Sequence, residues 1–164
     1  MMALKAMGVS NVYIVDIMEK RLEKALELGA TGIINAKEKN AIEEVMKITN
    51  NNGCDLVIET AGTEITTVQA IHMAKKGSNI VLVGYSKSGE MTLPMSLVLD
   101  KELTFKTVFR YRHIYNMAIE AVASGKVNLK GIITNEFDLD DVQKAMDYSV
   151  NNKADIVKAV IKIR

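Results

Sequence analysis

The segment from Asn11 to Ala30 restricts the possible folds of this chain more than any other stretch. It opens with the apolar run Val12–Val15, whose β-branched and aromatic residues are typical of a strand that is buried on both faces. The run ends at Asp16, and the following residues show a helical pattern in which apolar side chains recur every three or four positions. Gly29 comes after this pattern, at the place where glycine commonly ends a helix. The order of strand, acid and helix predicts one repeat of a parallel α/β sheet.

Asp16 has two interpretations. An acid at the carboxyl end of a parallel strand lies at the sheet edge where open α/β folds bind their ligands. In dinucleotide-binding folds such a carboxylate accepts hydrogen bonds from the adenosine ribose hydroxyls and repels the additional phosphate of NADP. The alternative is a purely structural role, because aspartate is also a good N-cap for a following helix. This segment alone leaves both interpretations open.

The N-terminal residues match the end of a helix rather than the start of a dinucleotide fold. Met1–Met7 are predicted to form the last turns of an apolar helix that stops at Gly8. The glycine fingerprint of a dinucleotide fold precedes its ribose acid by about 20 residues, and that position falls before Met1 when it is counted back from Asp16. No G-x-G-x-x-G motif occurs in the sequence. We therefore expect this chain to lack the first strand and the glycine-rich loop, and to be part of a longer protein.

The remaining sequence alternates between strand-like and helix-like segments. Strands are predicted at residues 32–35, 54–60, 79–85, 102–110 and 156–163, with a short extended piece at 132–134. Helices are predicted at residues 36–51, 65–76, 93–100, 114–124 and 138–151. In the helix at 114–124 the side chains expected to face inward are Met117, Ala118, Ala121 and Val122. The predicted fold class is α/β, a Rossmann-type doubly wound parallel sheet without its first strand and glycine-rich loop.

Composition excludes several classes of partner. A chain of 164 residues with a formal net charge of +1 corresponds to about one domain and gives no reason to expect nucleic acid as a partner. No apolar run is long enough to span a membrane, so we expect no membrane partner. The single cysteine, Cys54, excludes an internal disulfide and predicts a cytoplasmic location.

The residue types that usually bind metals or act as nucleophiles are scarce. Cys54 opens an apolar strand-like run and is predicted to be a small buried side chain rather than a nucleophile. His72 lies within a helical pattern. His113 follows a basic stretch, and contact with phosphate or substrate is the less favoured interpretation of this residue. Neither histidine has a ligand partner at zinc spacing, so we expect no metal ligand in this chain.

Several sequence pieces, in order, resemble the nucleotide-binding half of the zinc-dependent medium-chain alcohol dehydrogenases. Within that superfamily the pieces are most similar to the sorbitol and polyol dehydrogenase branch, to which VFRY in particular points. The resemblance covers nearly the whole chain, including a tail from Val127 to Ile163. The other pieces are KAMG at 5–8, VDIMEKRLEKALELGA at 15–30, DLVIETAG at 55–62, IVLVGY at 80–85 and KELTFKTVFRY at 101–111.

The resemblance implies a set of cofactor-binding residues. They are Asp16 at the adenosine ribose, Arg21 at the adenosine end, Thr60, Ala61 and Gly62 in a small-residue loop, Val83, Gly84 and Tyr85 beside the nicotinamide, and Phe109 and Arg110 near nicotinamide and substrate. Arg110 and Tyr111 are also implied to face the substrate. Structural alternatives are a helix-surface charge for Arg21, plain core and turn for Val83–Tyr85, and a surface arginine for Arg110.

The resemblance also implies what the longer protein does. Residues 1–164 correspond to a partial NAD-binding (Rossmann) domain plus the C-terminal helix–strand end, and the catalytic zinc domain is expected outside this chain. The implied reaction transfers hydride from a secondary alcohol or polyol to NAD, with zinc ligands and proton relay elsewhere, so we expect no catalytic residue here and an inactive isolated chain. A homo-oligomer is expected, because missing strand pairing leaves open edges and polyol dehydrogenases associate near Val108.

Four alternatives remain at this point. The chain is also compatible with part of a threonine or simple alcohol dehydrogenase, and with another ribose-binding enzyme such as a methyltransferase. A non-catalytic nucleotide-binding or oligomerisation module is a further possibility, although such a module should keep its glycine loop. The last is a truncated product without activity.

Overall fold

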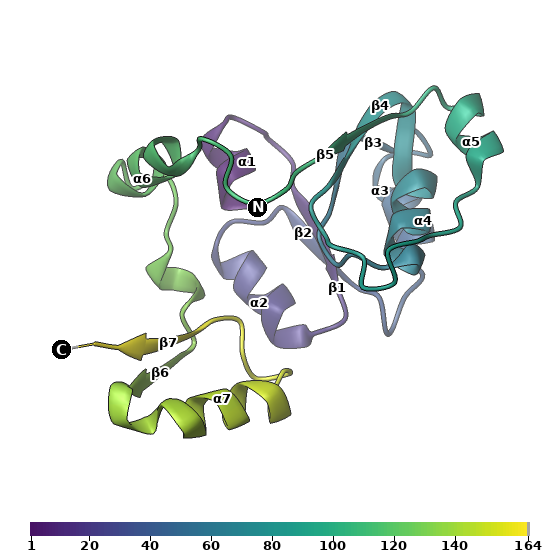
Figure 1. Cartoon of the computed structure of the whole chain (residues 1–164). Helices are drawn as coiled ribbons and strands as arrows, with labels where there is room; N and C mark the ends of the chain where they lie inside the picture. The colour runs from purple at the N-terminus through teal and green to yellow at the C-terminus, as the bar shows by residue number, and fades with distance from the viewer. Residues whose placement is uncertain (164) are drawn as a thin grey trace. The chain divides into compact units, whose positions relative to one another are not determined.

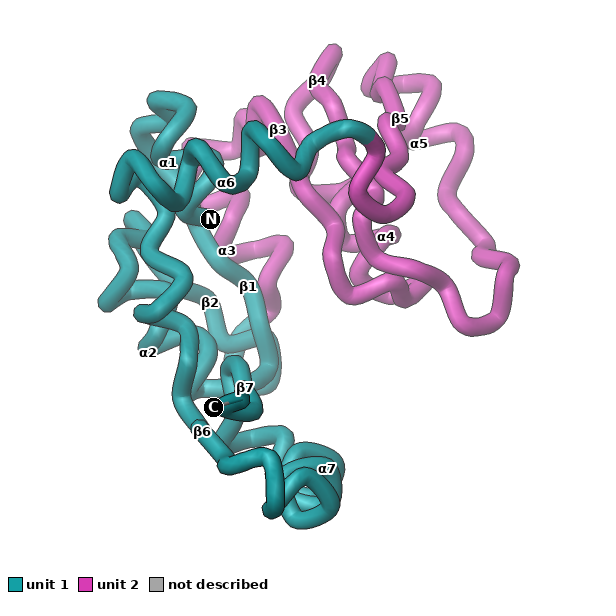
Figure 2. Tube along the Cα trace, turned by 60° about the vertical axis from the view of Figure 1, so that its left-hand side comes forward, with its two compact units in different colours: residues 1–39, 113–164 teal, residues 40–112 magenta. Residues whose placement is uncertain are grey.

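Parallel strand–helix repeats make up most of the computed structural model, which describes residues 1–163. The chain divides into two compact units (Figure 2), one formed by Met1–Lys39 with His113–Arg164 and the other by Asn40–Arg112. Figure 1 labels the helices and strands of both units. The α/β class with parallel strands is the one predicted from the sequence.

The N-terminal part of the first unit contains the strand–acid–helix segment. Its elements are α1 (Met2–Ala6), β1 (Tyr13–Asp16), α2 (Glu19–Glu27) and β2 (Gly32–Asn35). Strands β1 and β2 pair in parallel with Asp16 opposite Asn35. The hydroxyl of Thr31 accepts hydrogen bonds from the Val12 amide at 2.9 Å and from the Lys5 ammonium at 3.2 Å, which ties the end of α1 to this pair of strands.

The C-terminal part of the first unit contains a second parallel pair of strands. Its elements are α6 (Tyr115–Ala123), the 3₁₀ turns η1 (Lys130–Ile132) and η2 (Leu139–Asp141), β6 (Asn135–Asp138), α7 (Val142–Asn151) and β7 (Ala159–Lys162). Strands β6 and β7 pair in parallel. Phe137 of β6 and Tyr148 of α7 pack with ring centroids 5.9 Å apart, which fixes the helix against the strands.

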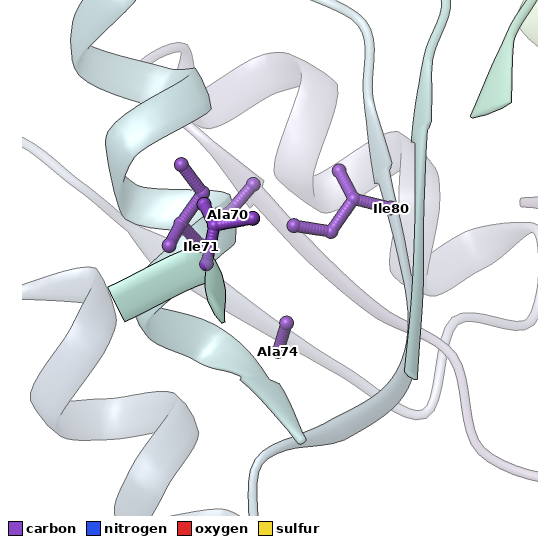
Figure 3. Packing of buried hydrophobic residues seen from close by; sticks show 5 residues of the cluster. Ala70, Ile71, Ala74 and Ile80 are labelled. Carbon is purple, nitrogen blue, oxygen red and sulfur yellow. The ribbon is translucent and has the colours of Figure 1, made fainter. Parts of the chain in front are cut away.

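The second unit is a three-stranded parallel sheet in the order β3-β4-β5. Its elements are α3 (Ala41–Ile48), β3 (Cys54–Glu59), α4 (Glu64–Met73), β4 (Ala74–Leu82), α5 (Met95–Asp100) and β5 (Thr104–Thr107). Figure 3 shows the buried side chains of its core, which come from α4, β4 and α5 and comprise Ala70, Ile71, Ala74, Ile80 and Val98. Because the strands are parallel, the segments that follow β3, β4 and β5 leave the sheet at the same edge.

Several boundaries differ from the sequence prediction. The helix predicted at 36–51 begins at Ala41, because the Asn40 side chain caps it by accepting hydrogen bonds from the amides of Ile42 and Glu43. The helix predicted at 65–76 ends at Met73, and β4 begins at the next residue, Ala74. The extended piece predicted at 132–134 lies instead at Asn135–Asp138, after a 3₁₀ turn.

Predicted burial was wrong in two places. In the run Val12–Val15, Val12 is buried, but Tyr13, Ile14 and Val15 are half-buried rather than buried on both faces. Within residues 1–163, β1 pairs on one side only, with β2. Helix α6 has no buried residue: Met117 is 69% exposed and Val122 37% exposed, Ala118 is also exposed and Ala121 is half-buried. The helical pattern identified the apolar positions of α6 correctly, but the described chain covers only Ala121, and that only in part.

Candidate functional site

Asp16 ends β1 with one carboxylate oxygen engaged and the other facing a cation. Its Oδ1 accepts hydrogen bonds from the backbone amides of Ile17 at 2.7 Å and Met18 at 2.9 Å. Its Oδ2 lies 3.8 Å from the Arg21 guanidinium, and the aspartate side chain is 26% exposed. The N-cap of α2 is Met18, so Asp16 closes the turn before the helix and does not cap the helix itself. The geometry leaves Oδ2 as an accessible acceptor for a hydroxyl group.

A second polar group lies beside Asp16 at the same strand edge. The side-chain nitrogen of Asn35, Nδ2, donates to Glu19 Oε2 at 2.7 Å and to Glu38 Oε1 at 3.3 Å. Its Oδ1 accepts from the backbone amide of Lys37 at 3.0 Å. Asn35 therefore links the end of β2 to the first turn of α2. The carboxylates of Asp16, Glu19 and Glu38 thus lie near the ends of β1 and β2. Their negative charge favours a ligand with hydroxyl groups over a ligand with an additional phosphate. Asn35 is a site residue that was not predicted, although it lies at the end of a strand expected from the sequence.

Glu59 at the end of β3 is buried, with 5% exposure, and was not among the residues predicted from the sequence. Its Oε1 accepts from the amides of Ala61 at 2.8 Å and Gly62 at 2.9 Å, and the Thr66 hydroxyl lies at donor distance, 2.8 Å. Its Oε2 lies 3.2 Å from the Gly62 amide. The available signal was positional: β3 ends on an acid, as β1 does.

The segments after β3 and β4 touch through their backbones. Gly62 has φ +70°, and a Cβ placed on it would lie 2.5 Å from the Tyr85 carbonyl oxygen. A Cβ placed on Gly84 would lie 2.1 Å from the Gly62 nitrogen. Both positions therefore require glycine, one for its conformation and for space and the other for space alone. The predicted segments Thr60–Gly62 and Val83–Tyr85 are thus brought together.

Three aromatic side chains are exposed at this edge of the second unit. Tyr85 is 79% exposed, Phe109 68% and Tyr111 64%. The guanidinium of Arg110 lies over the Phe109 ring, 5.0 Å from its centroid, and Arg110 adopts φ +57°. Val83 is 43% exposed, and Thr60 and Ala61 are exposed as well.

The histidines and the cysteine do not form a site. His72 is half-buried in α4, and His113 is exposed with φ +52°. Cys54 is half-buried, and burial followed by the neighbouring Asp55 raises the pKa of its thiol, which suits a packed side chain better than a nucleophile.

Neither a cluster of metal ligands nor a membrane-spanning helix occurs among the described residues. Among residues 1–163, no three or more His, Cys, Asp and Glu side chains gather in a way that would hold a metal ion, so a zinc site does not fit them. In the same part of the chain, no helix has both the length and the apolar character needed to cross a bilayer.

Comparison with known proteins places the chain in a family. A family model described as zinc-binding dehydrogenase matches residues 1–124. An uncharacterized zinc-type alcohol dehydrogenase-like protein of Escherichia coli is 41% identical to the chain over 98% of this chain and 46% of its own length. The sorbitol dehydrogenase of Bacillus subtilis is 34% identical over 97% of this chain and 45% of its own length. The chain thus spans about half the length of the curated relatives it matches.

A solved structure matches as well. The crystal structure of an Escherichia coli oxidoreductase/dehydrogenase of unknown specificity superposes with a TM-score of 0.93 at 40% identity, over 99% of this chain and 46% of that one. The similarity therefore extends from sequence to fold. The chain belongs to the zinc-binding dehydrogenase family.

Proposed function

We propose that this chain is the NAD-binding portion of a dehydrogenase that oxidises polyols or related secondary alcohols. The observation that carries the proposal is Asp16, which ends a parallel strand and keeps Oδ2 accessible beside Arg21. A carboxylate in this position of a dinucleotide-binding fold accepts hydrogen bonds from the adenosine ribose. The neighbouring Glu19 and Glu38 carboxylates around Asn35 support a preference for NAD over NADP.

The second unit is proposed to bind the nicotinamide end. The glycine contact between Gly62 and Gly84 brings the two loops together at backbone distance, and the exposed aromatic residues Tyr85 and Phe109 suit a planar ring. When bound, the nicotinamide supplies the group that takes up hydride. Arg110 and Tyr111 are proposed to face the hydroxyls of the alcohol, for which a fixed cation on an exposed segment is suited.

The proposed substrate follows the relatives. The sorbitol dehydrogenase of Bacillus subtilis is among them, and a human sorbitol dehydrogenase is 32% identical over 149 residues. No zinc-dependent step is assigned to the described residues, because they do not fit a zinc site. We therefore propose that the zinc ligands and the proton relay belong to another part of a longer protein. Turnover of sorbitol by the 164-residue chain with NAD and zinc would contradict this.

Association between copies of the chain is proposed as well. Within residues 1–163, strands β3 and β5 each have one edge without a strand partner, and Val108 after β5 is 47% exposed. Open edges pair readily with other strands. A dimer or larger homo-oligomer should appear in light scattering, whereas a monomer at high protein concentration would argue against it. The single cysteine supports a reducing compartment, and we propose the cytoplasm.

A non-catalytic nucleotide-binding module is the second candidate, because the same Asp16 geometry would serve binding alone. Calorimetric titration with NAD and with NADP, on the chain and on its Asp16→Ala variant, tests the shared binding step. We expect Asp16→Ala to weaken NAD binding by more than about 1 kcal/mol, the size of a hydrogen bond to a charged group. Equal NAD affinity of the two proteins would refute the ribose role of Asp16.

A version of the chain extended upstream separates the remaining cases. If only the extended version binds NAD, the cofactor site needs residues beyond this chain, and the dehydrogenase proposal stands. If neither version binds NAD, the cofactor proposal fails and a role in association becomes the better explanation.

A further inference from the structure

We propose that Glu59 is a positioning residue that gives the Thr60–Gly62 loop the shape in which it meets the nicotinamide cofactor. The inference rests on the proposed function, because it concerns the same cofactor site. Glu59 itself is buried and is not proposed to touch the cofactor. It acts through the loop that follows it.

The Glu59 carboxylate contacts both the loop that follows β3 and the first turn of α4. Its Oε1 accepts from the amides of Ala61 at 2.8 Å and Gly62 at 2.9 Å, with the Thr66 hydroxyl at 2.8 Å as a third donor. Its Oε2 lies 3.2 Å from the Gly62 amide. A buried carboxylate is costly unless such donors compensate it. The loop and the first turn of α4 are thus folded around one acceptor.

The hydrogen bonds of Glu59 also determine which backbone groups of the loop are free to bind a ligand. Glycine-rich loops that bind phosphate present free backbone N–H groups to the anion. Here the N–H groups of Ala61 and Gly62 are already bound to Glu59. The loop therefore exposes Thr60 and Ala61 rather than these two N–H groups, which suits van der Waals contact with a ring or ribose better than binding of a phosphate.

Glu59 also links the loop to its neighbour. The backbone carbonyl of Glu59 accepts from the amides of Val83 at 2.8 Å and Gly84 at 3.1 Å. A Cβ on Gly84 would also approach Glu59 Oε2 to 2.7 Å. Side chain and main chain of one residue therefore hold both segments that are proposed to contact the cofactor.

The test is NADH titration of the full chain, followed by the fluorescence of the reduced nicotinamide. Glu59→Gln keeps an acceptor at the Oε1 position, and its Kd should stay within about threefold of the wild type. Glu59→Ala removes both carboxylate oxygens that accept hydrogen bonds from the loop, and it should raise the Kd by about tenfold or more. If Glu59→Ala does not fold in urea-unfolding controls, Glu59→Asp replaces it, since the shorter side chain withdraws the carboxylate and should also weaken binding about tenfold. Glu64→Gln is the matched control, because Glu64 is an exposed carboxylate of the same unit that accepts from the Thr92 amide, and it should bind as the wild type does.

The outcomes separate the two proposals. A folded Glu59→Ala or Glu59→Asp variant that binds NADH as tightly as the wild type overturns the role of Glu59 and leaves the proposed function intact. Equal losses in Glu59→Gln and Glu59→Ala would also overturn it, because charge rather than the acceptor would then matter. If the wild-type chain binds no NADH, the same variants are titrated in the version extended upstream, and absence of binding there as well overturns the proposed function, and the Glu59 inference with it.

Discussion

The ends of β1 and β3 place the same kind of residue at the same point of a parallel strand, with opposite results. Asp16 is partly exposed and uses one oxygen for the turn, so the other oxygen remains accessible beside Arg21. Glu59 is buried, and both of its oxygens lie against backbone amides of the next loop. Burial rather than residue type therefore decides whether a strand-end acid is available to a ligand or shapes the backbone.

Substitutions at Asp16 and at Glu59 are therefore expected to have different effects. In the first unit, Asp16 is proposed to bind ribose through its side chain. In the second unit, Glu59 is proposed to shape the backbone of the Thr60–Gly62 loop. A substitution in the second unit should then alter packing and stability first, whereas one at Asp16 should alter binding with little effect on stability.

The largest expected effect comes from Gly84→Ala. The added Cβ would lie 2.1 Å from the Gly62 nitrogen, and backbone atoms cannot move aside as a flexible side chain would. We expect the free energy of unfolding to fall by about 3 kcal/mol, as for severe overpacking, in urea denaturation. Gly77→Ala is the control: φ is +72° there with no atom within 4 Å, so it should cost only about 1 kcal/mol. Equal losses for the two variants would contradict the close contact.

Lys101→Met should follow in size. The Lys101 ammonium donates to the carbonyls of Ile71 at 3.1 Å, His72 at 2.7 Å and Ala74 at 2.9 Å, and so satisfies the end of α4. Loss of these bonds should lower the free energy of unfolding by about 2 kcal/mol. Lys106→Met on an exposed position of β5 should change it by less than about 0.5 kcal/mol. If both variants melt alike, Lys101 is an ordinary surface lysine.

Ser78→Ala should stabilise the second unit slightly. The Ser78 hydroxyl is buried in β4 and has no hydrogen-bond partner among the described residues. Removing an unpaired buried hydroxyl should raise the free energy of unfolding by about 1 kcal/mol. A clear loss of stability in thermal melting would show that the hydroxyl has a partner in solution.

Arg21→Gln should have the smallest effect. The Arg21–Asp16 pair is 3.8 Å apart, and the Arg21 side chain is 45% exposed. Exposed pairs of this kind contribute about 0.5 kcal/mol or less. We expect unchanged thermal melting and about threefold weaker NAD binding by calorimetry. A loss as large as that of Asp16→Ala would mean that Arg21 contacts the cofactor directly and strongly.

The sequence predicted the order of elements well, because periodicity and glycine stops are local signals. It also predicted Asp16 at a strand end, and the contact between Thr60–Gly62 and Val83–Tyr85 agrees with their joint assignment to one site. Glu59 was missed because its burial depends on the packing of two loops, which no local pattern encodes. The exposure of Met117 in α6 was missed because an apolar helical face predicts burial without saying which surface supplies it.

The most direct measurement is calorimetric titration with 5′-AMP, which carries the adenosine ribose but no nicotinamide. The account predicts that Asp16→Ala weakens AMP binding by about tenfold, the loss expected for a hydrogen bond to a charged group. It also predicts that Glu59→Ala, if folded, leaves AMP binding within about twofold of the wild type while weakening NADH binding. AMP binding that is unaffected by Asp16→Ala, or weakened equally by both variants, would contradict the account.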